Sequence, residues 1–352
     1  MGNLRPPMEA IHSRFPAALL FADISGFTRL SERLAGRGER GVEDLTRILN
    51  AYFGRLIEII HAHGGDVVKF AGDALLAVWR ASDQSALASR VQAAAQCALA
   101  ARDALRGFAL EDGGTLALRL GIGAGETDAA TLGGIFGRWE YVVYGPALNE
   151  VTHAATRAEP DNVTAGIHAW TFLRGRFAGT EGTDGTRVDT AHEPYVATAL
   201  VIPEPTDEVA EYLLAYIPAG IHQRLAAGQS AWLGEMRRIT VLFVNLPDVR
   251  ADTPVQTMQR GMCSIQDGLY RFEGSVNKLS IDEKGVTLVA AFGLPPFAHE
   301  DDAERGVRAA LELRARLDKL GWGGRSGSPA DGSSAARLAA SGAANTRSSA
   351  TS

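Results

Sequence analysis

The chain has 352 residues, of which 46% are hydrophobic and 22% are charged, and its formal net charge is −6. This length predicts two domains, and the acidic balance argues against broad electrostatic binding to a nucleic acid polymer or an anionic membrane. Cys97 and Cys263 are too few for a disulfide framework, and no apolar run approaches the ~18 residues of a membrane span. We therefore expect a soluble, cytoplasmic protein with no membrane span.

The predicted elements alternate between strands and helices along the first half of the chain. An apolar strand at Ala17–Asp23 opens the series, and hydrophobic residues at three- and four-residue steps predict a helix over Val42–His61. A hairpin then surrounds the turn at residues 71–73. This order favours an α+β fold in which helices pack on a sheet. The remaining predicted elements are helices at 85–105 and 147–157 and strands at 67–70, 74–79, 116–122 and 141–144.

An internal repeat links the two halves of the chain. The strand that ends in Asp23 recurs as RITVLFVN, which ends in Asn245, and a hairpin sequence with Lys four residues before Asp also occurs twice. The second copy has a shorter segment between its strand and its lysine. The repeat indicates two copies of one domain. The matching segments are residues 19–25 with 241–247, and 63–79 with 272–293.

Composition changes suggest where the two copies begin and end. Prolines punctuate the segment between them, as is typical of a linker. The C-terminal segment is rich in Gly, Ala and Ser, with Leu338 as its only large aliphatic residue, so we expect it to be disordered. The predicted division is an N-terminal segment (1–16), a first domain (17–200), a linker (201–235), a truncated second domain (236–321) and a disordered tail (322–352).

Two carboxylates are the main candidates for chemistry. Asp23 ends a predicted strand and Asp73 lies in the hairpin turn, so both side chains project into the same space if the strands are neighbours. Such a pair, completed by phosphate oxygens and water, suits Mg²⁺ and can hold two ions beside a reacting phosphorus. The alternative is that each aspartate only caps a strand or a turn.

Residues 21–27 (FADISGF) and 64–79 (GGDVVKFAGDALLAVW) resemble the class III nucleotidyl cyclases. The likeness is greatest to the soluble, bicarbonate-responsive adenylyl cyclase type and its bacterial relatives, and that type carries two cyclase domains in tandem. The resemblance implies ferredoxin-like (βαββαβ) domains. It also implies conversion of ATP to 3′,5′-cyclic AMP and pyrophosphate, with two Mg²⁺ or Mn²⁺ ions as cofactors.

The resemblance assigns roles to individual residues. Two aspartates and one backbone carbonyl would be the metal ligands, three residues that open a helix would hold the phosphates through their amides, and a lysine of the second copy would read the purine. These residues are Asp23, Asp73 and the carbonyl of Ile24 for the metals, Ser25, Gly26 and Phe27 for the phosphates, and Lys278 for the purine.

The second copy departs from the family pattern. Asn245 replaces the first metal carboxylate, whereas Asp282 stands at the second position. The family's Asn and Arg pair, four residues apart, has no counterpart after residue 321. In the first copy Asn149 is followed four residues later by His153 in place of arginine. We therefore expect this chain alone to be weakly active or inactive.

The resemblance leaves three interpretations open. The chain is a metal-dependent adenylate cyclase module, a non-catalytic nucleotide-binding regulatory protein, or a truncated gene product. Its partners would be ATP and either a second copy in a homodimer or another cyclase domain. Bicarbonate activation is not expected, because Lys69 matches one of the family's two anion-binding cations but Thr152 stands at the other.

Overall fold

The structure, a computed structural model, describes residues 9–110, 114–218, 221, 238–294, 297–322 and 337–342. Contacts divide these residues into two compact units. The first unit comprises Ser13–Ala129 and Val143–Glu204. The second unit comprises the described residues 9–12, Ala130–Val142 and the described residues from Pro205 onward. Strand β5 therefore begins in the first unit and ends in the second.

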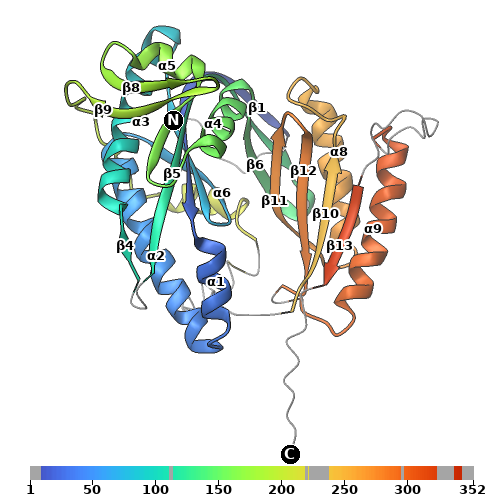
Figure 1. The fold of residues 1–352 in the computed structure, drawn as a ribbon. Coiled ribbons are helices and arrows are strands. Elements are labelled where there is room, and N and C mark those ends of the chain that lie inside the picture. The colour runs from blue at the N-terminus through green and yellow to red at the C-terminus, as the bar shows by residue number, and fades with distance from the viewer. Residues whose placement is uncertain are drawn as a thin grey trace, which may run out of the picture. The chain divides into compact units, whose positions relative to one another are not determined.

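The first unit is built on a mixed sheet whose strand order is β2-β3-β1-β5-β7-β9-β8, with β4 and β6 also pairing to β5 (Figure 1). The β2–β3 and β1–β3 pairs are antiparallel, and the β5–β7 pair is parallel. The strands are β1 (Ile11–Ser25), β2 (Asp66–Ala71), β3 (Ala74–Arg80), β4 (Phe108–Ala109), β5 (Thr115–Gly133), β6 (Trp139–Tyr144), β7 (Asn162–Ala165), β8 (Phe177–Gly182) and β9 (Gly185–Ala191).

Helices follow the order that the sequence predicts, and the mixed α+β fold is confirmed. The long α3 begins where the carboxylate of Asp83 accepts hydrogen bonds from the amides of Ser85 and Ala86. The helices are α1 (Phe27–Ala35), α2 (Glu39–Ala62), α3 (Gln84–Leu105), α4 (Pro146–Arg157), α5 (Ile167–Leu173), α6 (Asp207–Leu214) and a short 3₁₀ turn, η1 (Ile135–Gly137).

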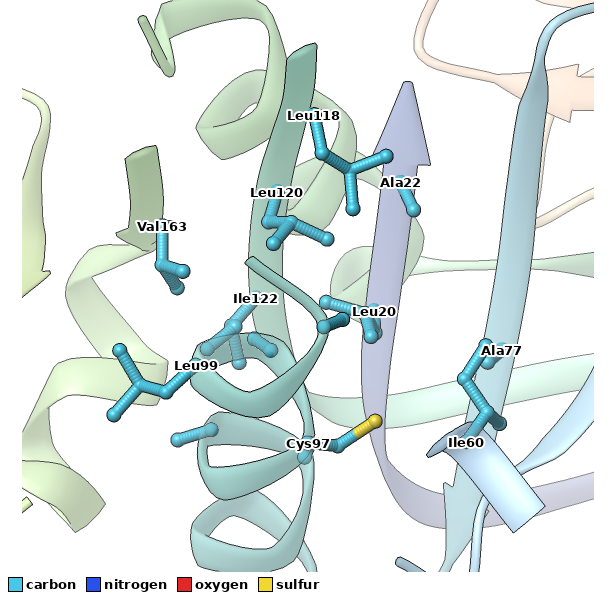
Figure 2. Packing of buried hydrophobic residues seen from close by; sticks show 14 of the residues in the cluster. Leu20, Ala22, Ile60, Ala77, Cys97, Leu99, Leu118, Leu120, Ile122 and Val163 are labelled. Carbon is cyan, nitrogen blue, oxygen red and sulfur yellow. The ribbon is translucent and has the colours of Figure 1, made fainter. Parts of the chain in front are cut away.

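The sheet of the first unit buries apolar side chains on both faces. Because successive residues of a strand point to opposite faces, β1 sends Leu20 and Ala22 to one core and Leu19 to the other. Figure 2 shows the larger core, where Leu20 and Ala22 lie near Leu118 and Leu120 of β5. Asp23 continues the series of Leu19, so its side chain belongs to the smaller-core face of the sheet.

The second unit contains a smaller sheet with the order β11-β12-β10-β13 (Figure 1). All three strand pairs are antiparallel. Helices α8 and α9 pack against each other and against this sheet. The elements are β10 (Thr240–Leu246), α8 (Val255–Tyr270), β11 (Ser275–Asp282), β12 (Gly285–Phe292), α9 (Asp302–Lys319) and β13 (Arg337–Gly342).

The same local geometry recurs in both units, with the glycines and lysines 209 positions apart and the aromatic residues 213 positions apart. A register shift precedes Lys69 in β2 and Lys278 in β11. A Cβ at Gly65 would lie 2.4 Å from the ring of Trp79, and one at Gly274 would lie 2.5 Å from the ring of Phe292. In addition, the amides of both glycines bond back to the preceding helix, each at 3.0 Å, with Ile60 O and Leu269 O as the acceptors.

The C-terminal segment differs in part from the predicted disorder over residues 322–352. Residues 337–342 form β13, which pairs with β10 from Thr240↔Gly342 to Asn245↔Arg337. The edge of β10 presents backbone N–H and C=O groups, and pairing satisfies them although the added strand has only one large aliphatic side chain, Leu338. Trp322 is also described, directly after α9. The rest of the predicted tail lies outside the described residues, as does most of the predicted linker beyond α6.

Candidate active site

Asp23 and Asp73 are brought together at one end of two neighbouring strands. Asp23 lies near the end of β1, opposite Ala74, the first residue of β3. Asp73 directly precedes Ala74 in the turn, and its carbonyl accepts a hydrogen bond of 3.2 Å from the amide of Ile24. Gly72 gives this turn its shape, because its φ of 74° is in the left-handed region that favours glycine. The predicted proximity of the two carboxylates is therefore confirmed.

Electrostatics at Asp23 reflect this proximity. Burial raises the pKa of Asp23 above its ordinary value, the negative charge of Asp73 raises it further, and the positive charge of Arg119 acts in the opposite direction. Like charges held close together in a partly buried site favour binding of a cation. The two carboxylates thus influence each other electrostatically.

Arg119 is a candidate site residue that the sequence analysis did not identify. It lies on β5, the strand beside β1, and its Nε is buried with no hydrogen-bond partner among the described residues. An unpaired buried guanidinium N–H is costly, so this group is available for an anionic ligand. The signal in the sequence is a charge within the apolar strand Leu116–Ile122, although that signal alone does not reveal the neighbouring strand.

The segment that follows Asp23 opens helix α1. Ser25 ends β1, Gly26 is the N-cap residue with a φ of 93°, and Phe27 begins the helix. No side chain caps the first turn, so its amides are not closed off by a cap hydrogen bond. The N-terminus of a helix presents N–H groups and a positive dipole to anions. The three predicted phosphate-binding residues therefore lie next to the carboxylate pair.

The corresponding end of the second unit is built differently. The Nδ2 of Asn245 donates to Oγ1 of Thr287 at 3.2 Å, so a neutral hydrogen bond stands where β1 carries Asp23 opposite Ala74. Asp282 corresponds to Asp73 by its spacing from the lysine, but this equivalence is wrong in the structure. Counted from the lysine, β2 ends two residues later, whereas β11 ends four residues later. Asp282 is therefore the last paired residue of β11, and the turn consists of Glu283 and Lys284.

The other predicted residues have different outcomes. Lys278 lies half-buried on β11 in the second unit, apart in the chain from the carboxylates, and its role as a purine contact stays a prediction. Thr152 lies on α4, where its hydroxyl donates to the carbonyl of Leu148 at 2.8 Å. It supplies no positive charge, so the structure gives no second cation at this position for an anion such as bicarbonate.

The donor chemistry of this site fits a hard divalent cation. The carboxylates of Asp23 and Asp73 and the carbonyl oxygen of Ile24 are the oxygen ligands that Mg²⁺ and Mn²⁺ prefer. Among the residues that the structure describes, no group of three or more His, Cys, Asp or Glu side chains is arranged to hold a metal. A metal at the pair would therefore need further oxygen ligands from water or phosphate.

Comparisons with known proteins show the family of the chain. The family described as Adenylate and Guanylate cyclase catalytic domain matches residues 11–192, more than half of the chain. The chain belongs to this family. The matched region includes both aspartates, the start of α1 and Arg119.

Curated relatives are cyclases from animals and bacteria. The chain is 26% identical over 353 residues to adenylate cyclase type 10 of Rattus norvegicus, a match that covers 89% of this chain and 21% of the relative. The Homo sapiens protein of the same name is 25% identical and also has 21% of its length covered. Adenylate cyclase 1 of Rhizobium meliloti is 31% identical over 145 residues, or 41% of this chain and 20% of the relative. The chain thus spans about a fifth of the length of these relatives.

Solved cyclase domains also match the chain. The adenylyl cyclase CyaB of P. aeruginosa is 20% identical with a TM-score of 0.43, covering 52% of this chain and 96% of that one. The guanylate cyclase domain of RhGC from Catenaria anguillulae, in complex with GTP, is 18% identical with a TM-score of 0.43, covering 51% of this chain and 99% of that one. Within the described part of the chain, no helix combines the length and the apolar character needed to cross a membrane.

Proposed function

We propose that the chain is an adenylate cyclase module that converts ATP to 3′,5′-cyclic AMP and pyrophosphate. The observation that carries this proposal is the Asp23–Asp73 pair, held at adjacent strand ends beside the open N-terminus of α1 and near Arg119, whose buried Nε has no hydrogen-bond partner among the described residues. In the proposed reaction a bond forms between the ribose 3′-oxygen and the α-phosphorus. The bond from that phosphorus to the pyrophosphate breaks, and the 3′-hydroxyl proton passes to solvent.

The residues of the first unit support distinct parts of this reaction. Asp23, Asp73 and the carbonyl of Ile24 would hold two Mg²⁺ or Mn²⁺ ions, which when bound would activate the attacking oxygen and stabilise the leaving pyrophosphate. Amides at the start of α1 would bind the terminal phosphates. Arg119 would neutralise phosphate charge through a guanidinium whose Nε has no other described hydrogen-bond partner.

We further propose that the second unit contains a shortened second copy of the domain, and that Lys278 of this copy contacts the purine. The recurring strand order, the register shift and the glycine–aromatic contact support this interpretation. The second copy would contribute no metal ligands, because Asn245 is neutral and Asp282 lies outside the turn. The names of the curated relatives favour ATP over GTP.

A second candidate function is a nucleotide-binding regulatory module without turnover. Helix α4 favours it, because the carboxamide Oδ1 of Asn149 is buried without a hydrogen-bond partner in the described structure, and the residue four positions later is His153. A neutral imidazole is a poor replacement for a fixed cation that stabilises a developing phosphate charge. We therefore expect low cyclase activity from this chain alone.

The test measures cyclic AMP formation and nucleotide binding by the full chain with ATP and with Mg²⁺ or Mn²⁺. We expect Asp73→Asn to lower cyclase activity by about 10²–10³-fold and to remove the metal-dependent part of nucleotide binding. The matched control is Asp282→Asn, at the position with the same spacing in the second unit. Equal effects of the two substitutions would contradict the proposed site. Metal-dependent ATP binding without any cyclic AMP would favour the regulatory function.

A further inference from the structure

Residues Ala130–Val142 form a hairpin arm that belongs to the second unit. The arm consists of the end of β5, the turn η1 and the start of β6. It meets helix α8 through two glutamines, Gln259 and Gln266, which are seven residues apart and therefore lie on one face of the helix. The arm and α8 are far apart in the sequence, so their contact is a long-range tertiary contact that depends on the side chains of both segments.

Gln259 pairs with a single residue of the arm in both directions. The amide of Gly133 donates to Oε1 of Gln259 at 2.8 Å, and Nε2 of Gln259 donates back to the carbonyl of Gly133 at 2.6 Å. Sγ of Cys263, one turn further along α8, also donates to that carbonyl at 3.2 Å. The side-chain amide of Gln259 thus occupies the hydrogen-bonding positions that a neighbouring strand would occupy.

Gln266 bridges the turn of the arm and is fully buried. The amide of Ile135 donates to its Oε1 at 3.2 Å, and its Nε2 donates to the carbonyl of Arg138 at 3.1 Å. A Cβ at Gly133 would lie 2.6 Å from the same Nε2, so the arm fits against this side chain only because residue 133 is glycine. Removing either partner would leave buried polar groups unsatisfied, which makes the contact selective.

The equivalent helix of the first unit, α2, lacks this set of side chains. The recurring hairpin geometry aligns the units at an offset of 209 residues, as Lys278 and Lys69 show. With this offset, Gln259, Cys263 and Gln266 correspond to Asn50, Gly54 and Ile57. Asn50 is one methylene shorter than glutamine, Gly54 has no side chain, and Ile57 can neither donate nor accept a hydrogen bond.

From this difference we infer that Gln259 and Gln266 are a glutamine clamp that makes the arm specific for α8 of its own chain and disfavours pairing of the arm with α2 of a second copy. The clamp thereby selects the intrachain contact of the arm with α8 over the equivalent contact of the arm with a second copy. Linker contacts add to the selection, because the amide of Trp139 in the arm donates to the carbonyl of Ala215, just after α6, at 2.8 Å. The inference is independent of cyclase activity.

The test is amide hydrogen exchange of the full chain, read on the peptide that covers the arm. We expect Gln259→Asn combined with Gln266→Ile, the residues of α2, to accelerate exchange of this peptide by at least about tenfold, since several hydrogen bonds are lost together. The matched control Gln256→Asn changes an exposed glutamine of the same helix and should leave the arm protected. An unchanged arm in the double variant would overturn the clamp.

Two further measurements keep the inference testable. Loss of exchange protection in β10–β12 would mean that the double variant unfolds the second unit as a whole. The Gly133→Ala variant, which changes only the arm, then serves as the test and should again accelerate exchange of the arm. Protection of the arm in the wild-type chain should not depend on protein concentration, because the contact is intrachain. Protection that falls on dilution, together with a dimer mass in light scattering, would assign the clamp to a second copy and overturn the intrachain choice.

Discussion

At the scale of single residues, the two units carry different side chains at matching strand positions, a carboxylate in the first unit and a neutral amide in the second. The first unit keeps Asp23 beside the negative charge of Asp73, whereas the second unit has Asn245 bonded to Thr287. A carboxylate whose pKa is raised by burial and by a like charge destabilises the folded protein when it is ionised. Ionised Asp23 therefore lowers the stability of the folded chain.

The stability of Asp23→Asn should reveal this cost as a function of pH. Below the ordinary carboxyl pKa of 3.8, Asp23 is protonated in both the folded and the unfolded chain, so its ionisation adds no difference between variant and wild type. As the pH rises, the unfolded chain loses this proton before the folded chain does, and the free energy of unfolding of the wild type falls relative to the variant. The difference stops growing above the raised pKa of the folded state.

We therefore expect the variant to have the higher melting temperature at neutral pH in the absence of divalent ions, with a gap that narrows in acid. Thermal unfolding between pH 3.5 and 8 measures it. Asp73→Asn should reproduce part of the gain, because the charge of Asp73 is the second cause of the raised pKa. A melting temperature gap that widens in acid would contradict this explanation.

The carboxylate pair was predictable from sequence, whereas Arg119 was not. Asp23 and Asp73 each end an apolar run or occupy a turn, and their neighbours form a recognisable motif, so local patterns are enough to find them. Arg119 comes close to Asp23 because β5 pairs with β1, a contact between residues about a hundred positions apart. Asp282 shows that sequence spacing alone can mislead, because its spacing from the lysine is preserved whereas the hairpin register is not.

At the scale of elements, β5 and α4 approach each other closely through glycines. A Cβ at Gly123 would lie 2.6 Å from both Ala147 O and Val151 N, and one at Gly121 would lie 2.4 Å from Ala155 N. Helix α4 therefore packs backbone to backbone on the strand that carries Arg119. The sequence predicts that this strand ends at residue 122, whereas in the structure it continues to Gly133, and nearly all of these further residues are buried.

Gly123→Ala should accordingly destabilise the first unit. The added methyl group meets backbone atoms of α4 that cannot move aside individually, and overpacking of this kind typically costs about 1–3 kcal/mol. The matched control is Gly54→Ala in α2, where a Cβ would meet nothing within 4 Å and where alanine is a better helix former. Denaturant unfolding should therefore show a loss for Gly123→Ala and a small gain for Gly54→Ala. Equal effects would show that the close approach does not limit the packing.

At the scale of the whole molecule, the sequence predicted the order of strands and helices better than their pairing. Periodicity located α2, α3 and α4 and the hairpin of β2 and β3, because each depends on neighbouring residues. The strands between residues 159 and 198 have weak periodicity and were not resolved as elements. The tail strand β13 has Leu338 as its only large aliphatic residue, and its position depends on the distant edge of β10.

Strand β13 covers the edge of β10 that would otherwise be unpaired. A chain that ends at residue 336 would leave the N–H and C=O groups of β10 on that side without the pairing that β13 supplies, and such an edge is a template for pairing with another chain. We expect this shortened chain to self-associate with rising concentration in light scattering and to exchange the amides of residues 240–246 faster.

A chain that lacks only residues 343–352 is the matched control, because it keeps all six residues of β13. It should behave as the full chain does in both measurements. The mechanism predicts that the full chain has a lower tendency to self-associate because its own tail completes the sheet of the second unit, in the same way that β5 lies beside β1 in the first. Monomeric behaviour of the chain ending at 336, with β10 still protected from exchange, would show that the edge does not need β13.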